Sequence, residues 1–323
     1  MLDSSRRRSP PIPRVKGMGG IISIYRRFLR PGLGSLPASM FLAGALGGCS
    51  PEPRASGLLT TVDDAGDTLT LAAPARRVVS LIPAATELLF AIGAGPHVVG
   101  RTQYCDFPAA AEAVPDLGDG IKPNVEAVVA QRPNLVVLYN SGQNAAVAGR
   151  LHALGIPSLR INTDALSSVP RAARMLGLLT GRQRGADSLI EVFDSALANA
   201  TRNSTARRPK VLLLVWEQPP MTIGRGSFLS ELIERAGGDN LFQDVTASSG
   251  VVSIEAVAAR NPDLIFTTAE GPAAFATRPE WQVVPAVRQK RFLRVTGSEF
   301  NRPSPRAPAA IRELTAQLSR LAP

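Results

Sequence analysis

Two segments of the chain share one pattern of apolar and polar positions. Residues 124–138 read NVEAVVAQRPNLVVL, and residues 253–267 read SIEAVAARNPDLIFT. In each segment apolar side chains first recur at helical spacing, then a proline interrupts the pattern, and a short apolar run follows. The first copy therefore predicts a helix over residues 125–131, a turn at Pro133 and a strand over Leu135–Tyr139. Because the phrase returns in the second half, we expect two α/β lobes of like topology.

The rest of the first half alternates short apolar runs with helical patterns, which predicts a parallel sheet covered by helices. Before this alternation, LLTTVDDAGDTLTL predicts a small hairpin over residues 58–71 that turns at Asp64-Ala65-Gly66. The elements expected next are a strand at Val78–Ile82, a turn opened by Pro83, a helix from Thr86 to Ile92 ended by Gly93 and Gly95, a strand and loop in HVVGRTQY, and, beyond the repeated phrase, a helix over residues 144–154 and a strand near Ser158–Asn162.

The second half predicts the same order of elements. They are a strand at Val211–Trp216, a loop in QPPMTIGRG, a helix at Ser227–Ala236 ended by Gly237-Gly238, the repeated phrase, a helix near residues 280–289, a strand at Phe292–Val295 and a final helix at residues 305–321. Between the halves, residues 168–204 show no strand pattern. Apolar side chains at helical spacing predict one long helix over residues 182–203, which Gly181 separates from the helix before it.

The predicted fold is therefore α/β, with two Rossmann-like lobes that each hold a central parallel sheet and are joined by one long rigid helix. A ligand is expected in the cleft between the lobes, near the C-terminal ends of the strands. The expected divisions are a signal peptide at 1–48, a tether and short hairpin at 49–75, an N-terminal lobe at 76–181, a connecting helix at 182–205 and a C-terminal lobe at 206–323.

Charge is distributed unevenly along the chain. The net charge is +10 over 323 residues, but the first 48 residues hold eight basic side chains and one acidic one. The remaining chain therefore carries only +3. A basic terminal segment is not the footprint of a basic face on a folded domain, so we expect no nucleic-acid partner.

The N-terminal segment is typical of an export signal. The basic string RRFLRPG precedes the apolar run SLPASMFLAGALGG, which is short for a membrane-spanning helix. Leu46-Gly47-Gly48-Cys49 follows and resembles a bacterial lipobox, in which the cysteine thiol accepts a lipid. We therefore expect an exported cell-envelope lipoprotein, either periplasmic or on the outer face of the cytoplasmic membrane, with the membrane as a partner through its anchor. The other cysteine, Cys105, then has no partner for an internal disulfide.

Three other kinds of site fit the residues poorly. A zinc or manganese site needs several histidines, and the chain has only His97 and His152. The string Gly93-Ala94-Gly95 follows a helix, whereas a dinucleotide-binding glycine motif follows a strand. No GxSxG elbow is present, and no motif places a histidine beside a serine or cysteine. A hydrolase or another enzyme on a two-lobed scaffold is therefore the weaker alternative, and we expect no enzyme, no metal site and no resident cofactor.

Four strings of the chain are informative together: RVVSLIPAATELLFAIGAGPHVVGRTQYCDFP, the two copies of the repeated phrase, and GGDNLF. With the order of parts, they resemble a known family, the helical-backbone substrate-binding proteins of ABC importers that take up cobalamin, haem and ferric siderophores. The first string and the SPR at residues 304–306 are most similar to the cobalamin-binding branch. The resemblance implies a monomer that carries a corrinoid or another metal chelate to an ABC permease and its ATPase. A ferric siderophore or haem is the alternative ligand within the family.

The resemblance also suggests a role for one glutamate in each lobe. Glu126 and Glu255 lie in the first turns of the two repeated helices, after the N-cap residues Asn124 and Ser253. A carboxylate there is favoured by the helix dipole alone. In the family, one glutamate on each lobe docks onto arginines of the permease, and both residues match that motif. The two interpretations are compatible.

Candidate ligand-binding residues come from the loops at the ends of the predicted strands. They are Pro83, Ala84, Tyr104, Lys122, Tyr139 and Asn140 in the first lobe, and Trp216, Met221, Arg225, Glu299, Phe300 and Arg302 in the second. Aromatic rings offer flat apolar area to a macrocycle, and polar neighbours can pair with its amides. Arg225, Arg302 and Arg306 are the cations expected to meet an anionic siderophore. The stretch LGDGIKPN lacks the tryptophan that cobalamin receptors carry before the first repeated helix.

Overall fold

The computed structural model describes residues 57–201, 208–268 and 273–321. The predicted signal segment at 1–48 and Cys49 lie outside the described residues, so the lipobox stays a prediction. The described residues all belong to one compact unit. Within them, no helix combines the length and the apolar character needed to cross a bilayer.

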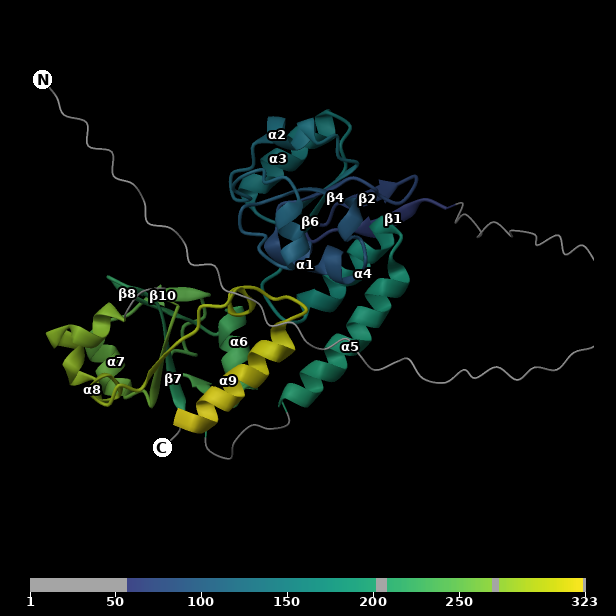
Figure 1. The fold of residues 1–323 in the computed structure, drawn as a ribbon. Coiled ribbons are helices and arrows are strands. Elements are labelled where there is room, and N and C mark those ends of the chain that lie inside the picture. Colours follow the sequence, from purple (N-terminus) through teal and green to yellow (C-terminus); the bar gives the residue numbers. More distant parts are fainter. Residues whose placement is uncertain (1–56, 202–207, 269–272, 322–323) are drawn as a thin grey trace, which may run out of the picture. The chain divides into compact units, whose positions relative to one another are not determined.

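The first lobe is drawn in blue and teal in Figure 1, where β4 and β6 are labelled. It is built on a four-stranded parallel sheet in the order β4-β3-β5-β6. Its strands are β3 (Val78–Ser80), β4 (Val98–Arg101), β5 (Leu135–Tyr139) and β6 (Ser158–Ile161), and its helices are α1 (Pro83–Ala91), α2 (Val125–Ala130), α3 (Gly142–Ala153) and α4 (Ser168–Thr180). The predicted alternation of strands and helices is confirmed. Helix α1 begins at Pro83, three residues earlier than predicted, because a proline at the first helical position needs no backbone N–H.

The predicted hairpin is also confirmed. Strands β1 (Leu59–Val62) and β2 (Thr68–Leu71) pair antiparallel. Its turn is fastened to the first lobe by acidic side chains: Asp64 pairs with Arg171, and Asp67 and Asp63 both pair with Arg160. The hairpin therefore extends the first lobe and is not a free tether.

The second lobe holds a mixed sheet in the order β10-β8-β7-β11-β12, with β9 also paired to β7. Its strands are β7 (Lys210–Glu217), β8 (Pro220–Ile223), β9 (Asp239–Asn240), β10 (Ser249–Val251), β11 (Leu264–Thr267) and β12 (Phe292–Arg294). Its helices are α6 (Phe228–Arg235), α7 (Ile254–Arg260), α8 (Pro285–Arg288) and α9 (Ala307–Leu321). Strands β7, β11 and β12 run parallel, as predicted. The short β9, which was not predicted, also runs parallel to β7, while β8 and β10 form an antiparallel edge.

Two details of the second lobe correct the sequence prediction. The segment read as a loop, QPPMTIGRG, contains strand β8, which opens with Pro220; a proline is tolerated at the first residue of a strand. The helix expected near residues 280–289 is split into a 3-10 helix at Pro279–Val283 and α8 at Pro285–Arg288. Pro285 disfavours helical backbone at Val284 before it, which explains the interruption.

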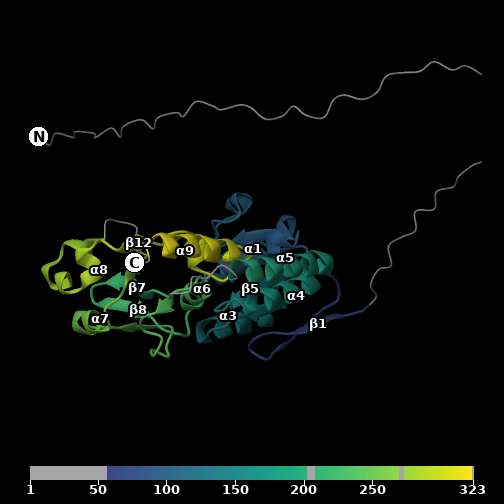
Figure 2. The same ribbon diagram turned by 90° about the horizontal axis from the view of Figure 1, so that it is seen from below.

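Helix α5 (Gln183–Thr201) leads from the first lobe toward the second, within the range predicted for the connecting helix. It packs against α4 at one end and against α9 of the second lobe at the other (Figure 2). Gly181, with a φ of +66°, ends α4 and turns the chain into α5. Gly185 lets α5 approach α1 closely, since a Cβ there would lie 2.3 Å from the carbonyl oxygen of Ile92. The rigidity of this connection stays a prediction.

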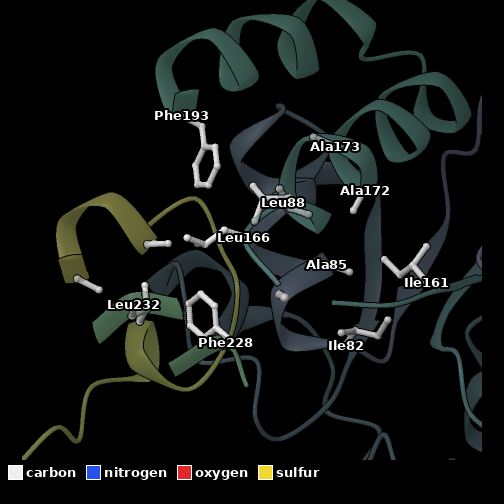
Figure 3. Packing of buried hydrophobic residues seen from close by; sticks show 14 of the residues in the cluster. Ile82, Ala85, Leu88, Ile161, Leu166, Ala172, Ala173, Phe193, Phe228 and Leu232 are labelled. Atoms are coloured by element: carbon white, nitrogen blue, oxygen red, sulfur yellow. The ribbon is translucent and has the colours of Figure 1, made fainter. Parts of the chain in front are cut away.

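A hydrophobic cluster of buried side chains runs through both lobes. Figure 3 shows Leu88 and Leu166 of the first lobe beside Phe193 of α5 and beside Phe228 and Leu232 of α6. The apolar faces of α4, α5, α6 and α9 all contribute to this cluster. The lobes are therefore joined by buried side chains as well as by the chain itself.

Candidate functional site

Two neighbouring cavities open where the strands of the first lobe end. The first has a volume of about 600 Å³ and is walled mainly by apolar atoms. The second, of about 570 Å³, is bordered by both lobes and is more polar. The first is lined by Leu81, Ile82, Pro83, Thr102, Tyr104, Asp119, Gly120, Ile121, Tyr139, Ser141, Gly142, Gln143 and Asn144. The second is lined by Ile82, Pro83, Ala84, Gln103, Tyr104, Asp106, Thr163, Thr296, Ser298, Asn301 and Arg302.

Three residues belong to both cavities: Ile82, Pro83 and Tyr104. Tyr104 is 55% exposed, so its ring is free to lie against a bound molecule. A ligand that fills both cavities would meet an apolar wall on one side of these residues and polar side chains on the other. This arrangement suits a large ligand with an apolar body and a polar periphery.

Tyr139 lies on the wall of the first cavity, at the C-terminal end of β5. Its hydroxyl donates a hydrogen bond of 2.8 Å to Oδ1 of Asp164. Burial, and then this hydrogen bond, raise the pKa of Tyr139 to about 12, so the phenol is neutral at physiological pH. The neighbouring Asn140 is turned away from the cavity, because its amide donates to the backbone oxygen of Asp64 in the hairpin turn.

Beside the second cavity, a cluster of charged side chains connects the two lobes. It consists of Arg302, Arg306, Glu87, Asp106 and Glu299. Glu87 of α1 is buried, and its side chain is only 2% exposed. Arg306, before α9, spans both of its oxygens: Nε donates to Oε2 at 2.9 Å and Nη2 to Oε1 at 2.7 Å. Nη1 of Arg306 donates to Glu299 at 2.6 Å. The cluster thus connects α1 of the first lobe to the start of α9.

Arg302 completes the cluster and reaches the second cavity. Its Nη1 donates to the backbone oxygen of Tyr104 at 2.8 Å, and its Nη2 donates to Asp106. Nε lies 3.1 Å from Glu87, but its N–H is not aligned for a hydrogen bond. Although burial opposes the charge of Arg306, its pKa is raised by Glu87, Glu299 and Asp106. The negative charges of three carboxylates therefore offset the positive charges of the two guanidinium groups.

Sequence reasoning missed Glu87 and Asp106. Glu87 is the one charged residue in the helix PAATELLFA, where the residues on either side are buried. A carboxylate buried in such a helix is costly unless a cation pairs with it. The lone glutamate of this apolar helix could therefore have indicated a buried ion pair. Asp106 carries no comparable signal, because its importance depends on the approach of Arg302 from almost 200 residues further along the chain.

Several predicted ligand residues lie outside both cavities. Phe300 is 4% exposed and packs in the hydrophobic cluster, so its ring does not face the cleft. Glu299 is held by Arg306. Trp216 is exposed, with its indole N–H bonded to the backbone oxygen of Gln218. Neither Met221 nor Arg225 lines either cavity, and Lys122 lies one residue beyond the lining residue Ile121. Of the predicted residues, the cavities bring together Pro83, Ala84, Tyr104, Tyr139 and Arg302.

The two repeated helices have matching N-termini. The side chain of Asn124 accepts from the N–H of Ala127 at 3.1 Å, and that of Ser253 accepts from the N–H of Ala256 at 3.1 Å. Glu126 and Glu255 are therefore each the second residue of their helix, and both are exposed.

The surroundings of the two glutamates differ. Glu126 pairs with Arg150 of α3 at 3.1 Å, with both side chains largely exposed. The pKa of Glu255 is lowered by its own backbone N–H and by the hydroxyl of Ser253, so this carboxylate is ionised at neutral pH. The same acid thus stands on a matched helix end in each lobe, with an arginine beside one copy.

The remaining candidate groups are placed as packing or surface residues. Burial, followed by the charges of Arg76 and Arg182, lowers the pKa of His97, which bonds to Arg76; His152 is exposed. Cys105 is buried against the hydroxyls of Thr86 and Thr102. Within the described residues, no three His, Cys, Asp or Glu side chains are grouped to hold a metal ion.

Comparison with known proteins places the chain in a family. The family model described as periplasmic binding protein matches residues 78–298, which include most of both lobes. The chain belongs to the periplasmic binding protein family. This periplasmic binding protein is 27% identical over 245 residues to a protein of Vibrio parahaemolyticus named vitamin B12-binding protein, a match that covers 75% of this chain and 88% of the relative.

A second relative of the binding protein comes from Bacillus subtilis and is named an uncharacterized ABC transporter substrate-binding lipoprotein. It is 30% identical over 265 residues, covering 79% of this chain and 83% of the relative. The name of this second relative assigns it to an ABC transporter. The binding protein is accordingly an ABC transporter substrate-binding protein and not an enzyme.

Solved structures confirm the predicted fold class. A periplasmic haem-binding protein of Roseiflexus matches with a TM-score of 0.70 and 23% identity, covering 77% of this chain and 99% of the other. The periplasmic vitamin B12-binding protein of Vibrio cholerae matches with a TM-score of 0.64 and 24% identity, covering 77% and 98%. At these identities the likeness establishes the two-lobed fold alone.

Proposed function

We propose that this protein captures a corrinoid such as cobalamin in the cleft and delivers it to an ABC permease and its ATPase. The observation that carries the proposal is the charge balance of the cleft. Among the residues that line the two cavities, Arg302 is the only basic one, and its guanidinium already serves Asp106 and the backbone of Tyr104. A corrinoid has an apolar ring system with amides around it, and so it needs hydrogen-bonding partners more than cations.

The arrangement of the cavities supports the same ligand. The apolar first cavity offers area to a macrocycle, while Gln103, Asn301 and Ser298 in the second can exchange hydrogen bonds with amides. Tyr104 and Tyr139 supply aromatic surface where the tryptophan of cobalamin receptors is missing. The vitamin B12-binding name of the Vibrio parahaemolyticus relative points the same way.

Haem or a ferric siderophore is the second candidate. The observation that favours haem is Tyr104, whose half-exposed phenol stands beside an apolar cavity and can serve as an iron ligand. The commitment of Arg302 and Arg306 to carboxylates opposes both alternatives, since anionic ligands need free cations.

An absorbance experiment tests the choice of ligand. Purified protein is incubated separately with cyanocobalamin, haem and a ferric hydroxamate and then desalted. We expect the corrinoid spectrum to remain with the protein in about equimolar amount, because one cleft holds one ligand. Retention of haem or the hydroxamate with no corrinoid would contradict the corrinoid proposal.

We further propose that the mature protein is a monomer anchored to the cell envelope by a lipid on Cys49. The support is the lipobox-like string and the word lipoprotein in the name of the Bacillus subtilis relative. Cys49→Ala should abolish incorporation of a labelled fatty acid, because only this thiol can accept the lipid. Cys105→Ala is the matched control and should be labelled like wild type. Equal labelling of all three proteins would contradict the anchor.

A further inference from the structure

Asp106 occupies an unusual place in the ion cluster of the cleft. Its side chain is 51% exposed, whereas the side chain of its partner Arg302 is 12% exposed. Both residues line the second cavity. The exposed acid therefore stands in the cavity wall and takes the hydrogen bond that Nη2 of Arg302 would otherwise offer to a ligand.

The other contacts of Arg302 do not replace this one. Nη1 is used by the backbone oxygen of Tyr104, and Nε faces the buried Glu87, which already spans Arg306. Nη2 is thus the part of the guanidinium that is paired with an exposed, charged side chain of the cavity wall. Loss of the Asp106 carboxylate would turn this side of Arg302 into an available cation beside the ligand.

We propose that Asp106 is a charge gate that determines which ligands the cleft accepts. By holding Nη2 of Arg302 it denies carboxylate-bearing and other anionic ligands their cationic partner, and its own charge repels them. Neutral, amide-bearing ligands do not need this cation, because Gln103 and Asn301 of the same cavity can exchange hydrogen bonds with amides. This inference rests on the proposed function in one respect, namely that the ligand occupies the second cavity.

The physical basis is competition between two acceptors, the carboxylate of Asp106 and that of an anionic ligand, for the same N–H group of Arg302. A carboxylate hydrogen-bonded to a guanidinium is a strong, charge-assisted pair. An anionic ligand must displace Asp106 to form such a pair, and the displaced acid would then lie beside another negative charge. Specificity achieved by an unfavourable contact with the wrong ligand is a common device in binding sites.

A matched pair of ligands tests the gate. Cyanocobalamin and its monocarboxylic acids share one macrocycle and differ in a single peripheral group, an amide in the first and a carboxylate in the second. Dissociation constants are measured for both with wild type and with Asp106→Ala. We expect Asp106→Ala to raise the affinity for at least one monoacid, relative to the affinity for cyanocobalamin, by about tenfold over the wild-type ratio. A change of this size corresponds to one charge-assisted hydrogen bond gained by the acid.

Two variants serve as controls. Asp106→Glu keeps the carboxylate and should retain wild-type discrimination. Asp116→Ala removes the same charge from an exposed acid outside both cavities, whose carboxylate accepts from the N–H of Gly118 and, within the described residues, pairs with no cation. Its ligand preference should stay at the wild-type value. An equal gain in Asp116→Ala would overturn the gate, since the effect would then arise from net charge.

Haem, which carries two carboxylates, keeps the two proposals separable. If wild type binds no corrinoid but Asp106→Ala gains affinity for haem over Asp116→Ala, the corrinoid proposal fails and the gate stands. If wild type binds cyanocobalamin and Asp106→Ala shows the same ratio of affinities as wild type for every monoacid, the gate is wrong and the corrinoid proposal stands. A similar gain for the neutral and the acidic corrinoid would also refute the gate, because the change would then be steric.

Discussion

Glu87→Ala should lower the free energy of unfolding by about 3 kcal/mol, and so reduce Tm by roughly 6–12 °C. The reason is that Glu87 is buried and serves two arginines, Arg302 and Arg306, which the substitution leaves without their shared partner. Removal of one member of a buried ion pair costs more than the pair contributes, because a desolvated charge is left behind. The expected value lies at the low end for such changes, since Asp106 and Glu299 remain.

Thermal and urea unfolding measure this effect, and two other acids provide the comparison. Glu299→Ala removes a partly exposed acid from the same cluster and should cost less than Glu87→Ala. Asp244→Ala removes an exposed acid that pairs with Arg260 elsewhere in the second lobe and should leave Tm near that of wild type. If Glu87→Ala unfolds at the same temperature as Asp244→Ala, the cluster does not hold the lobes together.

The double variant Glu126→Ala and Glu255→Ala should reduce uptake through the cognate permease by about tenfold or more, through lost steering and lost register at the interface. Ligand affinity and Tm should stay near wild type, because both side chains are exposed and the helix caps belong to Asn124 and Ser253. Transport assays with labelled ligand measure the first effect, and titration and thermal unfolding measure the second. Added salt should weaken the wild-type complex more than the variant complex.

The two single variants are expected to differ. Arg150 already pairs with Glu126, so Glu255→Ala should impair docking more than Glu126→Ala. The double variant Glu112→Ala and Glu280→Ala is the matched control, since it also removes one exposed acid from each lobe. Normal transport by the glutamate double variant, or transport lost equally in the control, would show that the two residues serve only their helix ends.

The fold was predictable wherever local patterns decide the structure. Helix α2, Pro133 and strand β5 form as the repeated phrase indicates, because apolar spacing and a proline act within a few residues. Strand β8 was not predictable in the same way. The prolines and glycines of the segment QPPMTIGRG around it are typical of a loop, and β8 becomes a strand because β7 on one side and β10 on the other offer partners.

The site was less predictable than the fold. Pro83, Tyr104 and Tyr139 could be placed because they lie at or shortly after the C-terminal ends of strands, and the ends of parallel strands meet at one edge of a sheet. Phe300 was expected in the cleft because it follows a strand too, yet its ring packs inward. Asp106 and Glu87 acquire their roles from Arg302 and Arg306, and no local pattern encodes a contact between such distant residues.

The hydrophobic cluster shared by the two lobes affects how the protein unfolds. Leu88 and Leu166 of one lobe and Phe228 and Leu232 of the other bury one another, so neither lobe can melt without exposing the apolar face of its neighbour. We therefore expect the two lobes to unfold in a single cooperative transition. A ligand that contacts either lobe therefore stabilises both, and its affinity can be read from the melting temperature of the whole molecule.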